Sequence, residues 1–425
     1  MESRKRTHST NNNDYPVHKK VKEDLLDQSD SIQELGCSIL SSSTSSSPQE
    51  AEPEIGPFDD YQSEIANAFE ETENPVFVAL NDFTYKIQGR NSKSRAGRNP
   101  FSNLPDEIIL KILGYFSRPE LVTAGLTCRR FGELAKDRNF WQRINLSRRK
   151  LDIDNIGHVL LSGVTILRLN STIFPNPAFS SSLLQKLESF TSSVRLLDLS
   201  DAYISCSDLR RLLSKMRLLE KLSLESVEVD EGVVEEVCQN RQLTTLNLAM
   251  ATGLNAKCVE LIVTKLTKLK SLNLGWTRLD ETAASLVCFS VSPDLTELDL
   301  SGCQFTLRNE YIVKLVERCR QIRMLDLSDC LLLSVSTLRE IIQKLPLLES
   351  LAISRCCQIQ AKYLVELEKL PNLKTLSVFD VNRCDELWEI QSRLPAVYIN
   401  QSPFSVIARP TVGMRRTSIW KEPTS

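Results

Sequence analysis

A leucine pattern at near-constant intervals constrains this chain more than any other feature of its sequence. The pattern is L-x-x-L-x-L, with other aliphatic residues in some copies, and it is clear in LTELDLSGC at residues 295–303. From Val194, successive copies begin 25, 24, 26, 26, 27, 26 and 25 residues apart. Copies begin at Val164, Val194, Leu219, Leu243, Leu269, Leu295, Ile322, Leu348, Leu373 and Leu394, and Trp141, Ile144 and Leu146 fit the same template.

This spacing is the period of leucine-rich repeats, in which one unit is a short strand followed by a helix. The leucines of each L-x-L step face the core, and the intervening stretches, such as RNEYIVKLVERCRQ at 308–321, carry apolar residues at helical spacing. No unit buries its leucines alone, so stacked neighbours supply the core. We therefore predict an α/β fold in which about ten repeats over residues 146–400 form a curved solenoid with a concave binding face.

The two ends of the chain differ from this array. Residues 1–98 include SILSSSTSSSPQEAEPEIGP and are predicted to be a disordered regulatory region, because they lack the apolar residues of a core. Two basic clusters there, Arg4-Lys5-Arg6 and Lys19-Lys20 with Lys22, are compatible with a two-part nuclear import signal or with a solvated basic tail. We expect a nuclear and cytoplasmic protein. Residues 401–425 form a tail, stiffened by Pro403 and Pro410, that we expect to return over the concave face with Phe404 as its anchor.

A short helical module precedes the repeats, at residues 99–145. In LPDEIILKILGYF, seven of the nine residues from Ile108 to Phe116 are apolar, which predicts a helix buried on nearly all sides. Asn103 is the expected N-cap of this helix, and stretches after Pro119 and Cys128 predict two more helices. Three helices in under fifty residues bury little apolar surface by themselves, so another surface is needed to cover the first helix.

The composition and motifs exclude several classes of function. The 425 residues carry a net charge of −2, with no apolar run of about 18 residues, so neither a nucleic-acid-binding protein nor a membrane span is indicated. The N-terminus has no apolar core, so we expect a reducing compartment in which the twelve cysteines are thiols. Phosphate-binding glycine motifs are absent, and His158 is the only histidine outside the N-terminal region. We expect a non-catalytic binding protein without a cofactor.

Three cysteines occupy one position of the repeat. Cys303, Cys330 and Cys356 each stand three residues past the last leucine-like position of their copy, where other copies have Ala251 and Thr277. A small buried residue is needed where the chain leaves the strand. We therefore interpret these cysteines as structural and expect no metal site, since no zinc-ligand spacing is present.

The residue just before this position indicates a binding surface. Down the array it is Trp276, Gly302, Asp329, Arg355 and Asp380, and strands of a sheet lie roughly 4.8 Å apart. An aromatic residue, an acid and a base are thus expected along one rim of the concave face. Tryptophan and arginine are preferred interface anchors, which favours recognition of a partner. The alternative is that Asp329 and Arg355 only pair with each other.

The helical module resembles the F-box family. The matching residues are Leu104, Pro105, Glu107, Ile108, Ile112, Phe116, Pro119, Leu121, Cys128 and Trp141. Two positions depart from the family pattern, with Thr127 where valine is usual and Phe131 where tryptophan is usual. The combination of this module with leucine-rich repeats and the tail segment INQSPFSVIARPTVG resembles the F-box proteins that carry such repeats.

This resemblance implies a substrate receptor of an SCF-type ubiquitin ligase. The matching F-box residues would bind the adaptor S-phase kinase-associated protein 1 and, through it, a cullin scaffold. The concave face and tail, with Trp276, Asp329, Arg355, Phe404 and Arg409, would bind a small cyclin-dependent kinase regulatory subunit and phosphorylated protein substrates such as cyclin-dependent kinase inhibitors. The alternative is a repeat scaffold or inhibitor that binds a partner without ubiquitin transfer.

Overall fold

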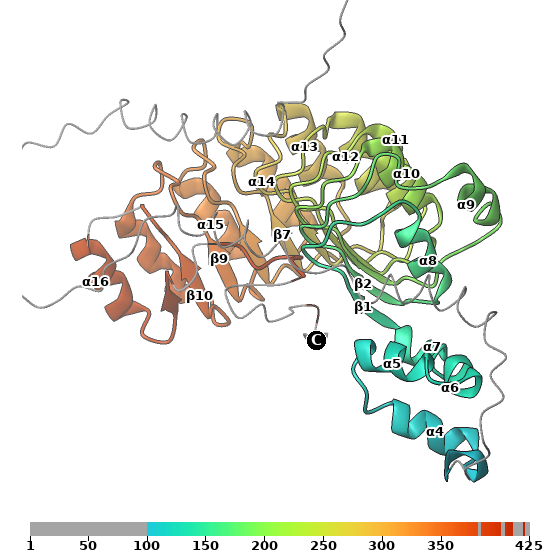
Figure 1. Cartoon of the computed structure of the whole chain (residues 1–425). Helices are drawn as coiled ribbons and strands as arrows, with labels where there is room; N and C mark the ends of the chain where they lie inside the picture. Colours follow the sequence, from blue (N-terminus) through green and yellow to red (C-terminus); the bar gives the residue numbers. More distant parts are fainter. Residues whose placement is uncertain (1–99, 381–383, 401–403, 411–419, 421–425) are drawn as a thin grey trace, which may run out of the picture. The chain divides into compact units, whose positions relative to one another are not determined.

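The computed structural model describes residues 100–380, 384–400, 404–410 and 420, and Figure 1 shows the elements they form. The predicted disordered region 1–98, both basic clusters and parts of the tail lie outside the described residues. No helix in the described part of the chain is long and apolar enough to cross a membrane.

The described chain begins with a module of short helices. A 3-10 turn, η2 (Pro100–Asn103), is followed by α4 (Asp106–Leu113), α5 (Arg118–Gly125), α6 (Arg129–Leu134) and α7 (Arg138–Trp141). The prediction of Asn103 as N-cap is wrong, because Asn103 ends the 3-10 turn and Pro105 occupies the cap of α4. The third predicted helix is divided into α6 and α7, since the Asp137 side chain accepts the Asn139 N–H and starts a new helix.

An open parallel sheet of 11 strands follows, and its spatial order is the chain order β1 to β11. Its strands are β1 (Arg143–Asn145), β2 (Ile166–Arg168), β3 (Leu196–Asp198), β4 (Lys221–Ser223), β5 (Thr245–Asn247), β6 (Ser271–Asn273), β7 (Glu297–Asp299), β8 (Met324–Asp326), β9 (Ser350–Ala352), β10 (Thr375–Ser377) and β11 (Tyr398–Ile399). The middle leucines of the repeats are in register, so that Leu272 pairs with Leu298 and Leu298 with Leu325. The predicted repeat pattern is confirmed.

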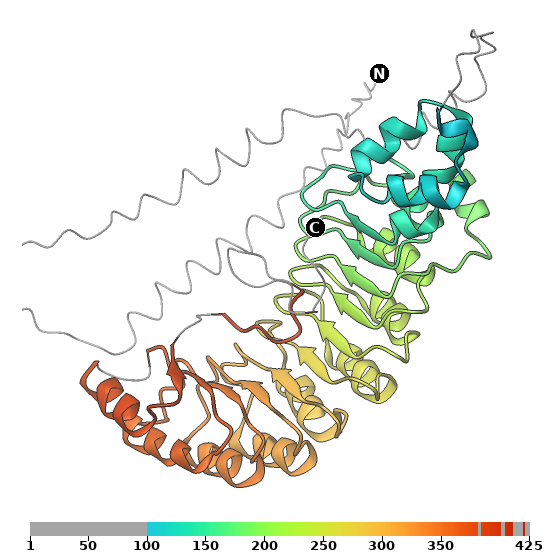
Figure 2. The same ribbon diagram turned by 90° about the horizontal axis from the view of Figure 1, so that it is seen from below.

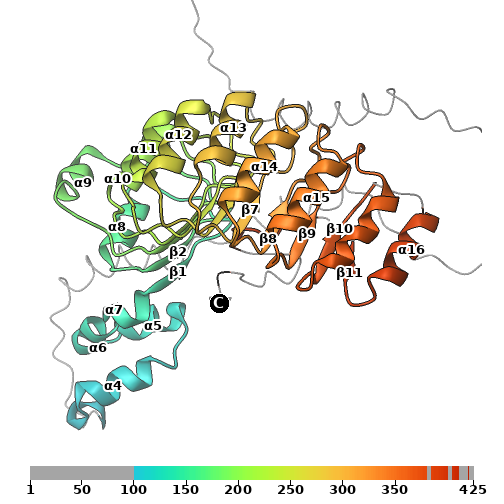
Figure 3. The same ribbon diagram turned by 180° about the vertical axis from the view of Figure 1, so that it is seen from behind.

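Helices connect successive strands and pack against one another along the outer side of the array, as Figure 3 shows from behind. They are α8 (Asn155–Leu161), α9 (Ser181–Lys186), α10 (Cys206–Ser214), α11 (Glu231–Cys238), α12 (Ala256–Lys265), α13 (Glu281–Ser290), α14 (Asn309–Arg318), α15 (Val335–Lys344), the 3-10 helix η3 (Ala361–Lys369) and α16 (Cys384–Arg393). Caps at 25-residue intervals begin five of them, because the side chains of Ser180, Ser205, Asp230, Asn255 and Asp280 each accept a backbone N–H of the first turn.

The core of the array is a single stack of aliphatic side chains between strands and helices. The three leucine-like residues of a typical repeat, Leu295, Leu298 and Leu300, are fully buried. Val122 and Trp141 join this core from the helical module, while Ile109, Leu113, Leu121 and Ala124 form a separate small core within the module. Figure 2 shows the strands on the inner side of the curved sheet and the helices on the outer side. The inner side is therefore the face that the helices do not cover.

Candidate functional site

The outer surface of the helical module carries large apolar side chains. Ile108 is 41% exposed, and Tyr115, Phe116 and Leu126 are also exposed, whereas Ile109 and Leu113 on the same helix as Ile108 are fully buried. Helix α4 is therefore covered on one side by its own module and bare on another. So much exposed apolar surface on so few residues is typical of an interaction site.

The residues that match the F-box pattern divide into surface and core. Pro105, Glu107, Ile108, Phe116, Pro119 and Cys128 are exposed, and Leu104 and Ile112 are half-buried. Leu121 and Trp141 are buried, and the Trp141 indole N–H donates to the Ala135 carbonyl over 2.8 Å. The Cys128 sulfur accepts the Phe131 N–H at the start of α6. The buried residues shape the module, and a partner can touch only the exposed ones.

A second surface is built where the chain leaves each strand. The residue between the two leucines of L-x-L turns its side chain inward and accepts the backbone N–H two residues later, as Asp299 does from Ser301. Equivalent bonds are made by Asn145, Asp198, Asn247, Asn273 and Asp326. Short carboxylate and amide side chains favour this local bond, so they fix the same turn in successive repeats.

The predicted rim column follows directly after this turn. Trp276, Gly302, Asp329, Arg355 and Asp380 all have left-handed backbones, with φ between 56° and 76°. Each of the first four donates its N–H to the next turn, for example from Trp276 to the Ser301 carbonyl and from Asp329 to the Ser354 carbonyl. The structure therefore brings the predicted residues together on adjacent turns.

The position of the Trp276 side chain depends on the absence of a side chain at Gly302, its neighbour in this column. The Trp276 side chain is 39% exposed and lies over Gly302, where an added Cβ would stand 2.7 Å from the indole Cδ2. A side chain at Gly302 would also be strained at φ 76°. Glycine at this position therefore allows the indole to lie flat on the rim.

Asp329 and Arg355 form a bidentate ion pair. The Arg355 Nε and Nη2 donate to the two Asp329 carboxylate oxygens, each over 2.5 Å. The Asp329 side chain is 10% exposed and that of Arg355 is 47% exposed. The hydrogen bonds that Arg355 donates to Asp329 raise the pKa of Arg355. The two side chains do pair with each other, and a partner that bound here would meet the ion pair as a unit.

The tail crosses the inner face, as the red segment in Figure 2 shows. We call residues 404–410 the tail strap. The Ile407 carbonyl accepts the Asn273 side-chain N–H over 3.0 Å, and Ile407 is buried. The buried Trp420 indole donates to the Ala408 carbonyl, and the Lys221 ammonium donates to the Trp420 carbonyl. The predicted anchor Phe404 is instead 70% exposed, because the opposite side of the strap faces the sheet.

An ion pair between Arg409 and Glu225 attaches the strap to the repeats. The Arg409 Nη2 lies 2.9 Å from the Glu225 carboxylate, and both side chains are mostly buried. Sequence reasoning named Arg409 but missed Glu225, Asn273 and Trp420. The inward position between the leucines, held by Asp or Asn in repeat after repeat, is a signal that could have indicated the polar inner residues.

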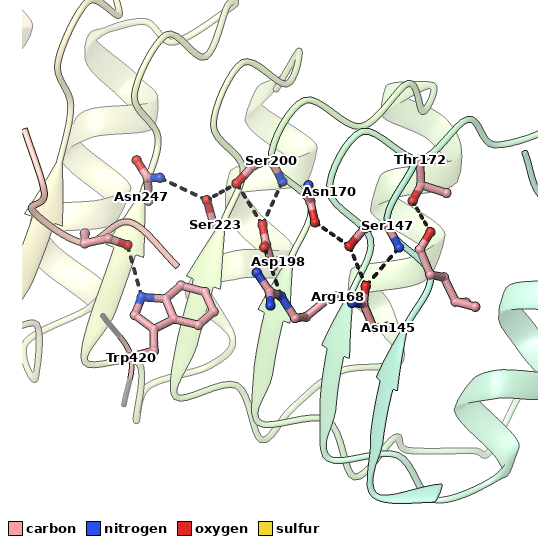
Figure 4. A network of polar contacts seen from close by, with 12 residues as sticks. Asn145, Ser147, Arg168, Asn170, Thr172, Asp198, Ser200, Ser223, Asn247 and Trp420 are labelled. Atoms are coloured by element: carbon pink, nitrogen blue, oxygen red, sulfur yellow. Dashed lines mark hydrogen bonds and ion pairs between the residues drawn. The ribbon is translucent and has the colours of Figure 1, made fainter. Parts of the chain in front are cut away.

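Polar side chains run along the inner face beneath and beside the strap. Figure 4 shows hydrogen bonds linking Ser200 to both Asp198 and Ser223, and Ser223 to Asn247. Further along, Asp299 and Asp326 are buried register partners on β7 and β8. Burial and the neighbouring Asp299 carboxylate raise the pKa of Asp326 to about 7.

The cysteines of the repeat turn are buried, as predicted. Cys303, Cys330 and Cys356 are at most 4% exposed, and the Cys356 thiol donates to the Leu327 carbonyl over 3.2 Å. Burial raises the pKa of all three thiols. Within the described ranges, no group of three or more His, Cys, Asp or Glu side chains is placed to hold a metal ion.

Comparisons with known proteins agree with this architecture. The family model described as the SKP2 LRR domain matches residues 154–424, and the model described as F-box-like matches residues 101–147. The first match covers more than half of the chain. The chain therefore belongs to the family of F-box proteins with leucine-rich repeats, and its repeat region is of the SKP2 type.

Individual relatives are more distant. The F-box/LRR-repeat protein 4 of Bos taurus is 26% identical over 283 residues, which are 65% of this chain and 42% of that protein. The chain thus spans less than half the length of this relative. Two solved structures are each 17% identical to this chain. The protein LegL7 of Legionella pneumophila covers 60% of this chain and 89% of its own, with a TM-score of 0.39. An internalin, inlF, of Listeria monocytogenes covers 71% and 95%, with a TM-score of 0.37. Both scores are too low to support a conclusion about this chain.

Proposed function

We propose that this chain is the substrate receptor of an SCF-type ubiquitin ligase and performs no bond chemistry itself. Its F-box would bind S-phase kinase-associated protein 1, and that adaptor would join it to a cullin scaffold. The observation that carries this proposal is the exposed apolar surface of Ile108, Tyr115 and Phe116 in a module that matches the F-box pattern. A receptor of this kind acts by holding its substrate near a charged ubiquitin-conjugating enzyme, which raises the effective concentration.

Co-purification with the adaptor and cullin tests this proposal. The Ile108→Glu variant of the full-length chain should lose the association at least about 100-fold, because a carboxylate would have to be desolvated in an apolar interface. Leu161→Glu on α8 is the matched control, since Leu161 is 43% exposed and Ile108 is 41% exposed. The control should retain both partners. Equal retention by the two variants would contradict the adaptor site and favour a repeat scaffold without ubiquitin transfer.

The finer part of the proposal concerns the substrates. The rim residues Trp276, Asp329 and Arg355, together with Phe404 of the tail strap, would bind a small cyclin-dependent kinase regulatory subunit and phosphorylated cell-cycle regulators in the nucleus and cytoplasm. Support comes from their placement on one face, where the Trp276 and Arg355 side chains are both exposed. Aromatic and arginine side chains are frequent anchors of interfaces.

Pull-down with a phosphorylated cyclin-dependent kinase inhibitor peptide, with and without the regulatory subunit, tests this part. Trp276→Asn should weaken capture of the phosphorylated peptide about tenfold while adaptor binding stays unchanged, and Asn tolerates the left-handed backbone at this position. Unphosphorylated peptide should not be captured. Capture that is indifferent to phosphorylation and to Trp276 would contradict the substrate assignment.

A further inference from the structure

The tail strap contacts a polar site on the inner face that we call the cradle. It consists of Glu225, Asn247 and Asn273. The Arg409 Nη2 contacts Glu225 Oε1 at 2.9 Å, with side-chain exposures of 20% and 18%. The other Glu225 oxygen accepts the Asn247 side-chain N–H over 2.8 Å. Because the Asn247 amide of β5 orients the Glu225 carboxylate, the position of this carboxylate does not depend on the strap alone.

The cradle also recognises the backbone before the arginine. The Asn273 side chain donates to the Ile407 carbonyl over 3.0 Å. Ala408, between Ile407 and Arg409, is 2% exposed, which leaves little room for a larger side chain. Ala408 has a left-handed backbone, with φ 57°, and the Arg409 N–H donates to the Val406 carbonyl, so the contacts select a turn in which a small residue precedes arginine. These are features of a peptide-binding site more than of a simple tail contact.

Two buried polar atoms, one in the strap and one on β3, have no hydrogen-bond partner. They are Arg409 Nε and Asp198 Oδ2. Asp198 is 1% exposed and faces Arg168 at 3.7 Å, a long distance for an ion pair. Burial raises the pKa of Glu225, the Arg409 charge and the Asn247 hydrogen bond oppose this rise, and Asp201 and Asp198 add to it. Buried polar atoms without partners are costly, so the strap is an imperfect occupant.

We propose that Glu225, Asn247 and Asn273 form a binding site for a peptide turn in which a small residue precedes arginine, and that the tail strap occupies this site as an internal competitor. A peptide from another protein would bind by displacing residues 404–410. This site is independent of the F-box and of the rim, so the inference stands apart from the proposed ligase function. The contacts that define it come from three neighbouring repeats, β4 to β6 with their turns.

Fluorescence anisotropy on the full-length chain tests this site. The probe is a fluorescein-labelled peptide with the strap's own sequence, FSVIARP, and the control probe has glutamine in place of arginine. Arg409→Gln weakens the internal competitor, so this variant should bind the arginine probe about tenfold more tightly than the unmodified chain. Adding Glu225→Gln should reverse that gain. Adding Glu236→Gln instead should not, because Glu236 pairs with Arg217 outside the cradle.

Hydrogen exchange of residues 404–410 in the unmodified chain provides a measurement that needs no variant. Millimolar arginine probe should accelerate exchange of the Arg409 amide, which donates to the Val406 carbonyl, and the glutamine probe should not. The site is supported if the arginine probe accelerates exchange and the glutamine probe does not, and if Glu225→Gln weakens binding of the arginine probe. Equal binding of both probes, binding unaffected by Glu225→Gln, or no acceleration of exchange would each overturn it.

Discussion

Asp326→Asn is expected to raise the free energy of unfolding by about 3–4 kcal/mol at pH 8 and by less than about 1 kcal/mol at pH 4. Burial and the adjacent Asp299 carboxylate raise the pKa of Asp326 to about 7, so the folded chain holds a proton that the unfolded chain releases near pH 4. Between these two values the folded state binds more protons, and stability therefore falls as the pH rises through this window. The Asn side chain carries no charge that must be desolvated, so the variant avoids this loss of stability at high pH.

The fold should accept the amide at this position. Asp326 Oδ1 accepts the Ser328 N–H over 2.9 Å, and Asn247 and Asn273 make the same bond in their repeats. Urea denaturation from pH 4 to pH 8 measures the effect, with exposed Asp294→Asn as the control that should change little. Stabilisation by Asp326→Asn that is equal at every pH would contradict the buried carboxylate pair as its cause.

Leu298→Ala is expected to lower the free energy of unfolding by about 3–4 kcal/mol. Leu298 is fully buried on β7, between its register partners Leu272 and Leu325, so its removal leaves a cavity in the centre of the stack. Neighbouring repeats depend on each other for burial, and the loss of hydrogen-exchange protection should therefore be greatest in the repeats beside β7.

Leu218→Ala is the matched control for this prediction, because Leu218 is 43% exposed in the segment before β4. It should cost less than about 0.5 kcal/mol. Chemical denaturation measures both variants. A similar cost for Leu218→Ala and Leu298→Ala would contradict the stacked leucine core as the main source of stability.

Much of the fold follows from spacing, because burial in a repeat array is periodic. The L-x-x-L-x-L copies place their leucines in register, and the same spacing places Trp276, Gly302, Asp329 and Arg355 on successive turns. Spacing does not determine which side chains within a column interact. Whether Arg355 points to a partner or to Asp329 depends on its rotamer, and the structure shows the ion pair.

The tail shows where sequence reasoning fails. A segment outside the helices and strands has no periodic pattern to indicate its buried side, so Phe404 is as plausible an anchor as Ile407 or Trp420. Which tail residues are buried is determined by contacts with residues far away in the sequence, such as Asn273 and Lys221. The F-box motif has a similar ambiguity, because it mixes the core residues Leu121 and Trp141 with surface residues such as Ile108.

Calorimetric titration of the full-length chain with purified S-phase kinase-associated protein 1 tests the central claim most directly. The exposed apolar side of the F-box predicts one-to-one binding with a negative heat-capacity change, the mark of apolar burial. Absence of binding, or binding without that heat-capacity change, would contradict the claim that Ile108, Tyr115 and Phe116 form the adaptor site.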